Sequence, residues 1–327
     1  MAKSTIKKPV IILVILALIA VGAWFFIQKT ATNRVEEEVQ QFLVQHELQD
    51  RLSYAKLEAS PSGTVTLHKV TLLDDEGELL LSADEVKLNR FKEEQDFQEV
   101  DFTIKNIVDV SGELFREELN ALFAEIDKPA PQHLDVASYY KLDGAAGEVT
   151  LKSSVLIPDF LEVGGMLNLA NPAAVLDLSN YLAANPDVEE MTPELMSLLA
   201  KITLKDLSLE LKDKGGVPSL MQLVEKQQLA DEQATLTASE REQMVQMKLA
   251  QAKQECINTA GLAMVIDDLE GACTKLFDFL SNQRSDIKFK ASVVKPISVE
   301  EFMMLSLMGA MRPEQFFNEY QPSIVIE

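Results

Sequence analysis

A nine-residue strand pattern occurs twice in this chain and limits the folds that it can adopt. TVTLHKVTL spans residues 64–72, and KITLKDLSL spans residues 201–209. Apolar and polar side chains alternate within each stretch, which is typical of a β-strand with one buried face. The apolar residues at matching offsets are Val65, Leu67, Val70 and Leu72 in the first stretch and Ile202, Leu204, Leu207 and Leu209 in the second.

The alternation is interrupted in the middle of both stretches. The second and third apolar residues are three positions apart, although side chains on one face of a strand lie two positions apart. If one face of the sheet is to stay apolar, the chain needs a β-bulge or a sharp twist at each interruption. The sequence therefore predicts such a feature at His68-Lys69 and at Lys205-Asp206.

The rest of the chain mixes strands with amphipathic helices. Residues 54–90 predict three adjacent antiparallel strands, and residues 134–157 predict a hairpin that turns at 144–147. A strand followed by an amphipathic helix occurs at 102–126 and again at 201–229, which we interpret as a duplicated module. We expect an α+β fold in which a curved antiparallel sheet packs against amphipathic helices.

An apolar segment near the N-terminus predicts a membrane anchor. Residues 9–27 form a run of 19 residues without a charged side chain, and a helix of this length spans about 30 Å of hydrocarbon. A cleaved signal peptide is the alternative, but its apolar region is only about 7 to 15 residues long. We expect a cytoplasmic tail at 1–8, a transmembrane anchor at 9–28, a juxtamembrane helix at 29–52 and a periplasmic α+β domain at 53–327.

Charge is distributed unevenly along the chain. The net charge is −22, yet residues 1–34 contain five Lys or Arg and no acidic residue. Three lysines precede the apolar run, which favours a cytoplasmic N-terminus in a bacterial inner membrane and places the acidic body in the periplasm. An acidic body is repelled by phosphate backbones, so we expect no nucleic-acid partner.

The chain has two cysteines, Cys256 and Cys273. In an oxidising compartment they are a candidate disulfide. Two small buried apolar side chains on helices are the other interpretation. The sequence leaves both open, and metal ligation would need at least two further ligands.

No residue pattern matches a catalytic or cofactor site. HExxH, GxSxG and phosphate-loop motifs are missing from the sequence, and its three histidines lie in separate predicted elements. The pairs Gly164-Gly165 and Gly215-Gly216 lack the partners of a nucleotide loop, so we interpret both as turns. We expect no enzyme, no metal and no cofactor.

A methionine-rich stretch lies near the C-terminus. Its helical spacing beside leucines is typical of a core helix. The alternative is an apolar contact surface for lipid tails or a partner helix. The residues of this candidate surface are Phe302, Met303, Met304, Met308 and Met311.

Residues 63–88, GTVTLHKVTLLDDEGELLLSADEVKL, resemble the opening of bacterial AsmA-like and TamB-like envelope proteins. The order of anchor, helix and strand-rich body over residues 1–90 also resembles the YdgA-like inner-membrane proteins. Both resemblances imply a single-pass inner-membrane protein in envelope maintenance that contacts lipid. This chain is too short to bridge the periplasm, and it is rich in predicted helix after residue 170, which argues against bulk lipid transport.

The sequence as a whole predicts a non-catalytic single-pass inner-membrane protein. Its periplasmic domain would act in cell-envelope homeostasis by binding lipid or another envelope protein. The alternative is an accessory or structural subunit of an inner-membrane complex, with the anchor and the methionine-rich stretch as its contact surfaces.

Overall fold

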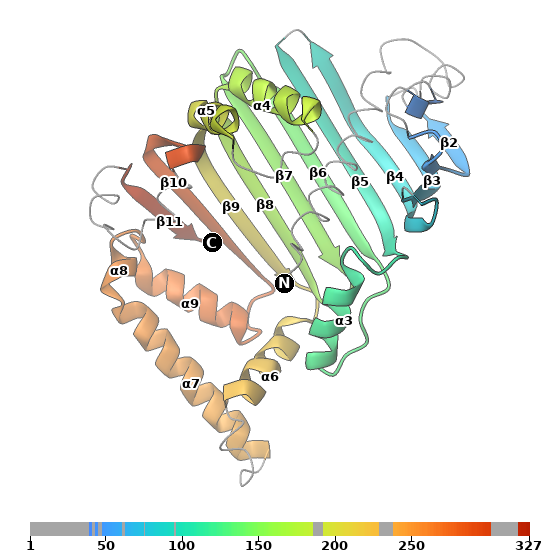
Figure 1. Ribbon diagram of the computed structural model, residues 1–327. Helices are drawn as coiled ribbons and strands as arrows, with labels where there is room; N and C mark the ends of the chain where they lie inside the picture. The colour runs from blue at the N-terminus through green and yellow to red at the C-terminus, as the bar shows by residue number, and fades with distance from the viewer. Residues whose placement is uncertain are drawn as a thin grey trace. The chain divides into compact units, whose positions relative to one another are not determined.

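The chain is described by a computed structural model, in which the described residues form an α+β fold with a large antiparallel sheet and several helices (Figure 1). The predicted tail and anchor at 1–28 and the methionine-rich residues 302–311 lie outside the described residues. Those described are 39–40, 43–44, 48–60, 63–74, 76–94, 96–185, 192–228, 238–301 and 320–327.

From β2 onward, strands that are neighbours in the sequence are also neighbours in the sheet. Their bounds are β1 (Leu52–Ser53), β2 (Lys56–Ala59), β3 (Val65–Leu73), β4 (Leu79–Glu94), β5 (Phe97–Asp109), β6 (Leu134–Asp143), β7 (Glu148–Ile157), β8 (Leu161–Ala170), β9 (Thr203–Asp213), β10 (Asp286–Ser298) and β11 (Pro322–Ile326). Hydrogen-bonded strands follow the order β1-β3-β4-β5-β6-β7-β8-β9-β10-β11, and β2 also pairs with β3. Such an order needs only turns or returning helices as connections.

Helices follow or separate these strands. Their bounds are α3 (Arg116–Glu125), α4 (Pro172–Ala184), α5 (Pro193–Lys201), α6 (Val217–Gln228), α7 (Ala238–Asn258), α8 (Ala260–Ala263) and α9 (Leu269–Leu280). The pair Thr192-Pro193 is typical of a helix start in the sequence. The start of α5 confirms this, because Thr192 Oγ1 accepts a hydrogen bond from the Leu195 amide and Pro193 occupies the first turn. The hairpin predicted over 134–157 is also confirmed, as β6 and β7.

The juxtamembrane helix predicted over 29–52 ends earlier than expected. Residues 39–40 and 43–44 are helical, but residues 49–51 form a turn. Leu52 already pairs with Leu72 in the sheet, and each side chain is only 4% exposed. Burial of this apolar pair draws Leu52 into β1 instead of the helix.

The chain divides into two compact units, each with its own hydrophobic core. The first contains Met1–Lys141 and Ser153–Pro158, and the second contains Leu142–Lys152 and Asp159–Glu327. The core of the first unit lies on β1 and β3 to β5, where Val39 and Leu43 from the helical residues add to it. The core of the second unit lies among α6, α9, β10 and β11.

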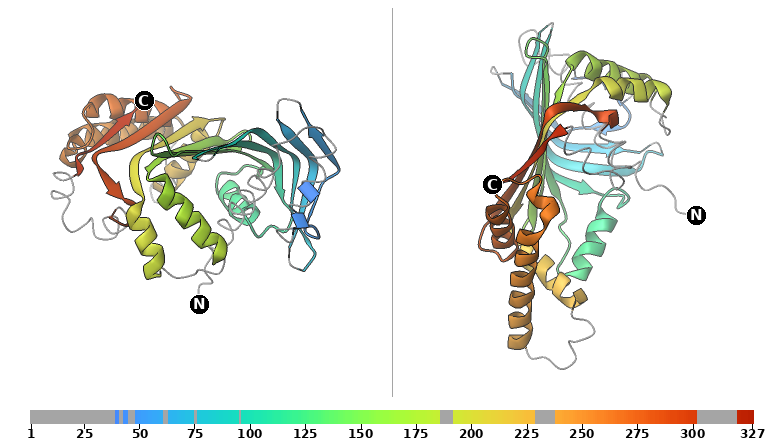
Figure 2. Two further views of the ribbon diagram at one scale, coloured as in Figure 1. Left: turned by 90° about the horizontal axis from the view of Figure 1, so that it is seen from above. Right: turned by 90° about the vertical axis from the view of Figure 1, so that its left-hand side faces the viewer.

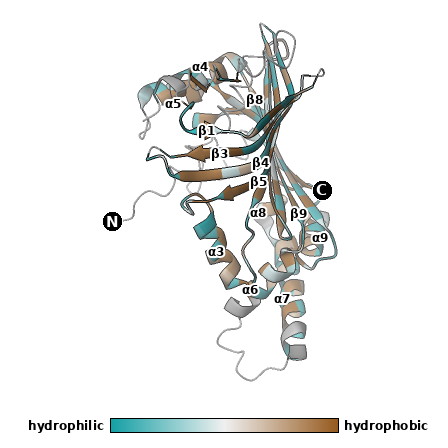
Figure 3. Ribbon diagram, turned by 90° about the vertical axis from the view of Figure 1, so that its right-hand side faces the viewer, coloured by the Kyte–Doolittle hydropathy of each residue, from teal (hydrophilic) through white to brown (hydrophobic). Residues whose placement is uncertain are grey.

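One face of β3 stays apolar in spite of the interrupted alternation. Val65, Leu67, Val70 and Leu72 are all buried, and the hydrophobic colour of β3 is plain in Figure 3. The pairing of β3 with β4 is not shifted at the interruption. Lys69 instead adopts a positive φ of 54°, so the strand changes face by a local twist.

The same change of face crosses the neighbouring strands as a line of polar side chains. Asp84 in β4 accepts hydrogen bonds from Lys69 Nζ (2.6 Å) and from Asn106 Nδ2 (2.7 Å). Asn106 in β5 has a φ of 53°, and its backbone amide donates to Asp135 Oδ1 in β6 (2.8 Å). We call Lys69, Asp84, Asn106 and Asp135 the inversion line. The buried apolar residues of β5 on either side of it are Val100, Phe102, Ile104 and Ile107.

In β9 the corresponding change is a bulge. Asn168 of β8 pairs with Asp206, but the next residue, Leu169, pairs with Leu204. Lys205 is therefore the extra residue of β9. The predicted bulge or twist is confirmed at both places, as a twist in β3 and as a bulge in β9.

Both predicted strand–helix modules join the strand to the helix through an aspartate. Asp109, the last residue of β5, is 1% exposed, and its carboxylate accepts backbone N–H donors of the turn that leads into α3. The carboxylate of Asp213, the last residue of β9, likewise accepts backbone N–H donors of the turn that leads into α6. The donors are Gly112, Leu114, Phe115 and Arg116 to Asp109, and Gly215, Gly216 and Val217 to Asp213, at 2.8 to 2.9 Å. That the modules are duplicates of each other stays a prediction.

The first testable prediction concerns the Asp109 carboxylate. Burial alone would raise its pKa, but the amides of Phe115, Arg116, Leu114 and Gly112 outweigh that effect and hold the pKa below its ordinary value. We expect Asp109→Ala to lower the free energy of unfolding by about 2 kcal/mol at about pH 7. Asp213→Ala, which removes fewer hydrogen bonds, should cost about 1 kcal/mol in the same urea titration.

The contribution of Asp109 should also depend on pH. A carboxyl group whose pKa is lower in the folded state stabilises that state above the unfolded pKa of about 3.9, and the stabilisation is lost as the pH falls through the folded pKa. The difference in stability between the wild type and Asp109→Ala should therefore shrink below about pH 4. A difference that stays constant in acid would contradict the assigned role.

A second prediction concerns the inversion line. Asn106→Val places a β-branched side chain at positive φ and removes the bond to Asp84, so we expect a loss of about 2–3 kcal/mol in urea unfolding. Asn106→Gly keeps the backbone conformation accessible and should cost only about 1 kcal/mol. Equal losses in the two variants would show that the twist is not what makes the position sensitive.

Candidate functional site

In the second unit, β8, β9 and β10 carry apolar side chains on one face and polar side chains on the other. In β9, Leu207, Leu209 and Leu211 alternate with Ser208 and Glu210, so the two sets point to opposite faces. Residues paired across strands share a face. Leu207 lies between Leu167 and Ala291, Leu209 between Gly165 and Phe289, and Leu211 between Val163 and Ile287.

One end of this apolar face is covered by helices. Ile287 is 0% exposed and belongs to a core with residues of α6 and α9, and Leu211 and Phe289 pack against that core. This end of the sheet is therefore an ordinary buried interface. The buried members of the core are Val217, Val265, Ile266, Ala272, Phe279, Ile287 and Ile326.

The middle of the same face is open, between this core and the buried residues Leu169 and Ile297, which pair with Leu204 beyond the bulge. Leu207 and Leu209 are each 42% exposed, although they lie on the same strand and face as Leu211. Single exposed leucines are common on protein surfaces, but these two are adjacent on one face and their partners across the sheet are small or apolar. We call Leu167, Leu207, Leu209, Ala291 and Gly165 together the apolar strip.

Gly165 forms a bare position within the strip. Both Gly164 and Gly165 pair with β9, opposite Glu210 and Leu209, so the prediction that they form a turn is wrong. The backbone of Gly165 does not have a positive φ, and a Cβ there would meet no described atom closer than Ser208 O, at 3.9 Å. Neither the backbone nor the described packing requires glycine at this position, and its missing side chain leaves the strip open.

The second glycine pair behaves as predicted and provides a contrast. Gly215 has a φ of 114° and begins the turn between β9 and α6. A Cβ at Gly216 would lie 2.5 Å from Phe160 O, so this position has room only for glycine. Phe160 O also accepts hydrogen bonds from the amides of Lys214 and Gly216. Gly216 is thus required by packing, whereas Gly165 is not.

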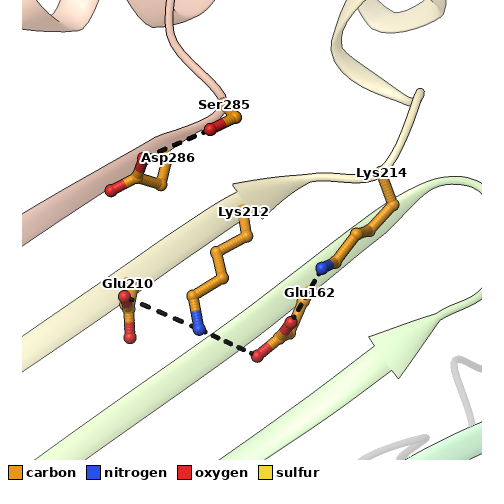
Figure 4. Close-up of polar contacts among 6 residues, drawn as sticks. All are labelled: Glu162, Glu210, Lys212, Lys214, Ser285 and Asp286. Carbon is orange, nitrogen blue, oxygen red and sulfur yellow. Dashed lines mark hydrogen bonds and ion pairs between the residues drawn. The ribbon is translucent and has the colours of Figure 1, made fainter.

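The opposite, polar face of these strands carries a group of paired charges (Figure 4). Lys212 Nζ lies 3.1 Å from Glu162 Oε1 and 3.7 Å from Glu210 Oε1, and Lys214 Nζ lies 3.3 Å from Glu162 Oε2. Burial opposes ionisation of Glu162, but the two lysines outweigh it and lower its pKa, while the hydrogen bond with Glu162 raises the pKa of Lys212. The charges partner one another and hold β8 against β9.

The outer edge of β11 is partly occupied by its own unit. Glu327 exchanges backbone hydrogen bonds with Lys288 of β10, so Ile324 and Ile326 direct their backbone groups outward. The Ile324 amide donates to Val265 O (2.7 Å), and Lys275 Nζ donates to Ile326 O (2.6 Å). These bonds use groups that an added strand would need.

A disulfide joins the two helices α7 and α9. Cys256 and Cys273 are bonded with a Cα–Cα distance of 6.1 Å, which is the pairing that the sequence left open. Cys273 is 1% exposed, and α7 lies beside α9 (Figure 2). The bond therefore fixes α7 to the helix that covers the buried end of the apolar face.

The sequence-predicted candidates do not converge on one place. The candidate surface of Phe302, Met303, Met304, Met308 and Met311 lies outside the described residues, as does His46. Across the described ranges, no group of three or more His, Cys, Asp or Glu is arranged to hold a metal ion. The apolar strip was missed, although Val163, Leu167 and Leu169 keep a strand alternation through the glycine pair and could have indicated it.

Comparison with known proteins gives no assignment. No model of a known protein family matches the sequence, and no curated protein matches it either. Of the helices that the structure describes, none is both long enough and apolar enough to cross a membrane; residues 9–28 are not among them.

A third prediction concerns the disulfide. Because the bond closes a loop with a sequence separation of 17, the paired variant Cys256→Ser/Cys273→Ser should lose about 3 kcal/mol of unfolding free energy. Amide hydrogens of α7 should exchange faster, while those of β3 to β5 in the other unit should not change. Met247→Ser, at a position 68% exposed in α7, is the matched control, and unchanged exchange of α7 in the paired variant would contradict the role of the bond.

Proposed function

We propose that the protein is a non-catalytic, single-pass protein of the bacterial inner membrane whose periplasmic body binds a lipid or another envelope protein. The observation that carries this proposal is the exposed middle of the apolar face, where Leu207 and Leu209 are each 42% exposed. A soluble domain ordinarily covers an apolar sheet face with its own helices. Here the exposed pair lies between the core of α6 and α9 at one end and the buried residues Leu169, Ile202 and Ile297 at the other.

Location supports the same proposal. Residues 9–27 have the length and composition of a membrane anchor, with lysines on its N-terminal side. The Cys256–Cys273 disulfide suits an oxidising compartment such as the periplasm. We also propose, from the resemblance to AsmA-like, TamB-like and YdgA-like proteins over residues 1–90, that the sheet is curved and that the protein serves envelope homeostasis.

The acidic body favours uncharged or apolar ligands. The net charge of the whole chain is −22, and its basic residues 3, 7, 8, 29 and 34 lie outside the body, so the body repels nucleic acid and anionic headgroups. The attraction to a lipid would therefore come from its acyl chains and not from a headgroup phosphate. An accessory role in an inner-membrane complex would use the anchor and the methionine-rich stretch as contact surfaces for a protein partner.

The fourth prediction tests location and binding together. Alkaline phosphatase fused to the C-terminus should be active, because it folds only outside the cytoplasm, and deletion of residues 1–28 should abolish that activity. Full-length protein extracted in mild detergent should carry phospholipid in native mass spectrometry. An inactive full-length fusion would reject the location, whereas a monomer free of lipid and protein partners would reject binding. A stable protein complex without lipid would favour the accessory role.

A further inference from the structure

We propose that one acyl chain of a membrane phospholipid lies on the apolar strip, with Gly165 as the position over which the chain passes. This inference rests on the proposed function and deepens it by naming the ligand and its site. The strip consists of Leu167, Leu207, Leu209, Ala291 and Gly165, on adjacent strands of the second unit.

The first argument is the chemistry of the strip. Its side chains are apolar, and no polar residue lies between them on this face, because Ser208, Glu210 and their partners point to the opposite face. The charged groups of the neighbouring polar face are already paired with one another. The open surface therefore offers hydrophobic contact and no hydrogen bonds, which suits a hydrocarbon chain.

The second argument is the bare position at Gly165. A glycine in a strand interior weakens the strand unless its backbone or its surroundings require it. At Gly165 neither does: φ is not positive, and a Cβ would find its nearest described neighbour at 3.9 Å. A strand glycine that neither its backbone nor its described neighbours require fits the close approach of a ligand.

The third argument is size, which favours a lipid chain over a protein. Strands are about 4.8 Å apart and residues on one face repeat about every 6.8 Å, so the strip measures roughly 10 Å by 7 Å. A stable protein interface needs about 800 Å² from each partner. Strand addition at β11 is also hindered, since Val265 O and Lys275 Nζ occupy its outer backbone groups.

The fourth argument is supply. The predicted anchor at residues 9–27 would keep this unit next to a bilayer. The phospholipids of that bilayer would then be the nearest source of acyl chains. Because the anchor tethers the unit to the bilayer, it would raise the effective concentration of phospholipid at the strip. An acidic chain of net charge −22 gains nothing from an anionic headgroup, so the acyl chain carries the binding.

The test uses full-length protein in bilayer nanodiscs that contain phosphatidylethanolamine with a photoreactive diazirine on one acyl chain. After illumination, labelled peptides are located by mass spectrometry. We expect labels within residues 161–170 and 203–213, and labels within 9–27 from the surrounding bilayer. Gly165→Leu, which fills the bare position, should lower labelling of the strip about tenfold without lowering labelling of the anchor.

The control variant is Val325→Leu, which adds apolar volume at a position that is 48% exposed and points to the opposite face, and it should leave strip labelling unchanged. Thermal unfolding verifies that each variant is folded. If Gly165→Leu does not fold, the double variant Leu207→Gln/Leu209→Gln takes its place, because both side chains are exposed.

The outcomes separate this inference from the proposed function. Labels within 9–27 but none on the strip would overturn the inference and leave the anchored protein intact. Strip labels that persist in a folded Gly165→Leu variant, or a strip crosslinked to a second copy of the chain, would also overturn it. An anchor without labels would reject the membrane location on which both rest.

Discussion

A sheet with one buried face must keep that face apolar along every strand, and the first unit meets this requirement at the inversion line. Lys69 and Asn106 both turn to positive φ, and Asp84 binds both side chains. The strands change face together, so their pairing need not slip. Without this twist, Val65 and Leu67 would lie on one face and Val70 and Leu72 on the other, and the core on β3 to β5 could not close.

The second unit meets the same requirement with a bulge at Lys205, beyond which Leu169 and Ile297, the partners of Leu204, are buried. The disulfide and the core at Ile287 concentrate α6, α7 and α9 at one end. Leu207 and Leu209 remain exposed in the middle of the face. Gly165 adds no side chain to the apolar strip beside these leucines. The exposed apolar surface is the physical basis of the proposed lipid-binding role.

Local signals in the sequence predicted much of the fold. The β6–β7 hairpin, the Thr192 cap and the two interruptions depend on neighbouring residues, so their patterns are readable. The glycine pair in β8 was misread as a turn because bare glycines signal turns by default, whereas cross-strand pairing with Leu209 holds Gly165 in the sheet. Which part of the apolar face is covered could not be predicted, because it depends on distant segments such as α9, which packs against Ile287.

Oxidation of side chains by hydroxyl radicals tests the central claim most directly. Full-length protein would be footprinted in nanodiscs and again in detergent after removal of lipid, and the oxidised residues would be compared. The account predicts that Leu207 and Leu209 are protected only when phospholipid is present, while the exposed Met247 and Met264 are oxidised equally in both samples. Equal oxidation of Leu207 and Leu209 with and without lipid would contradict it.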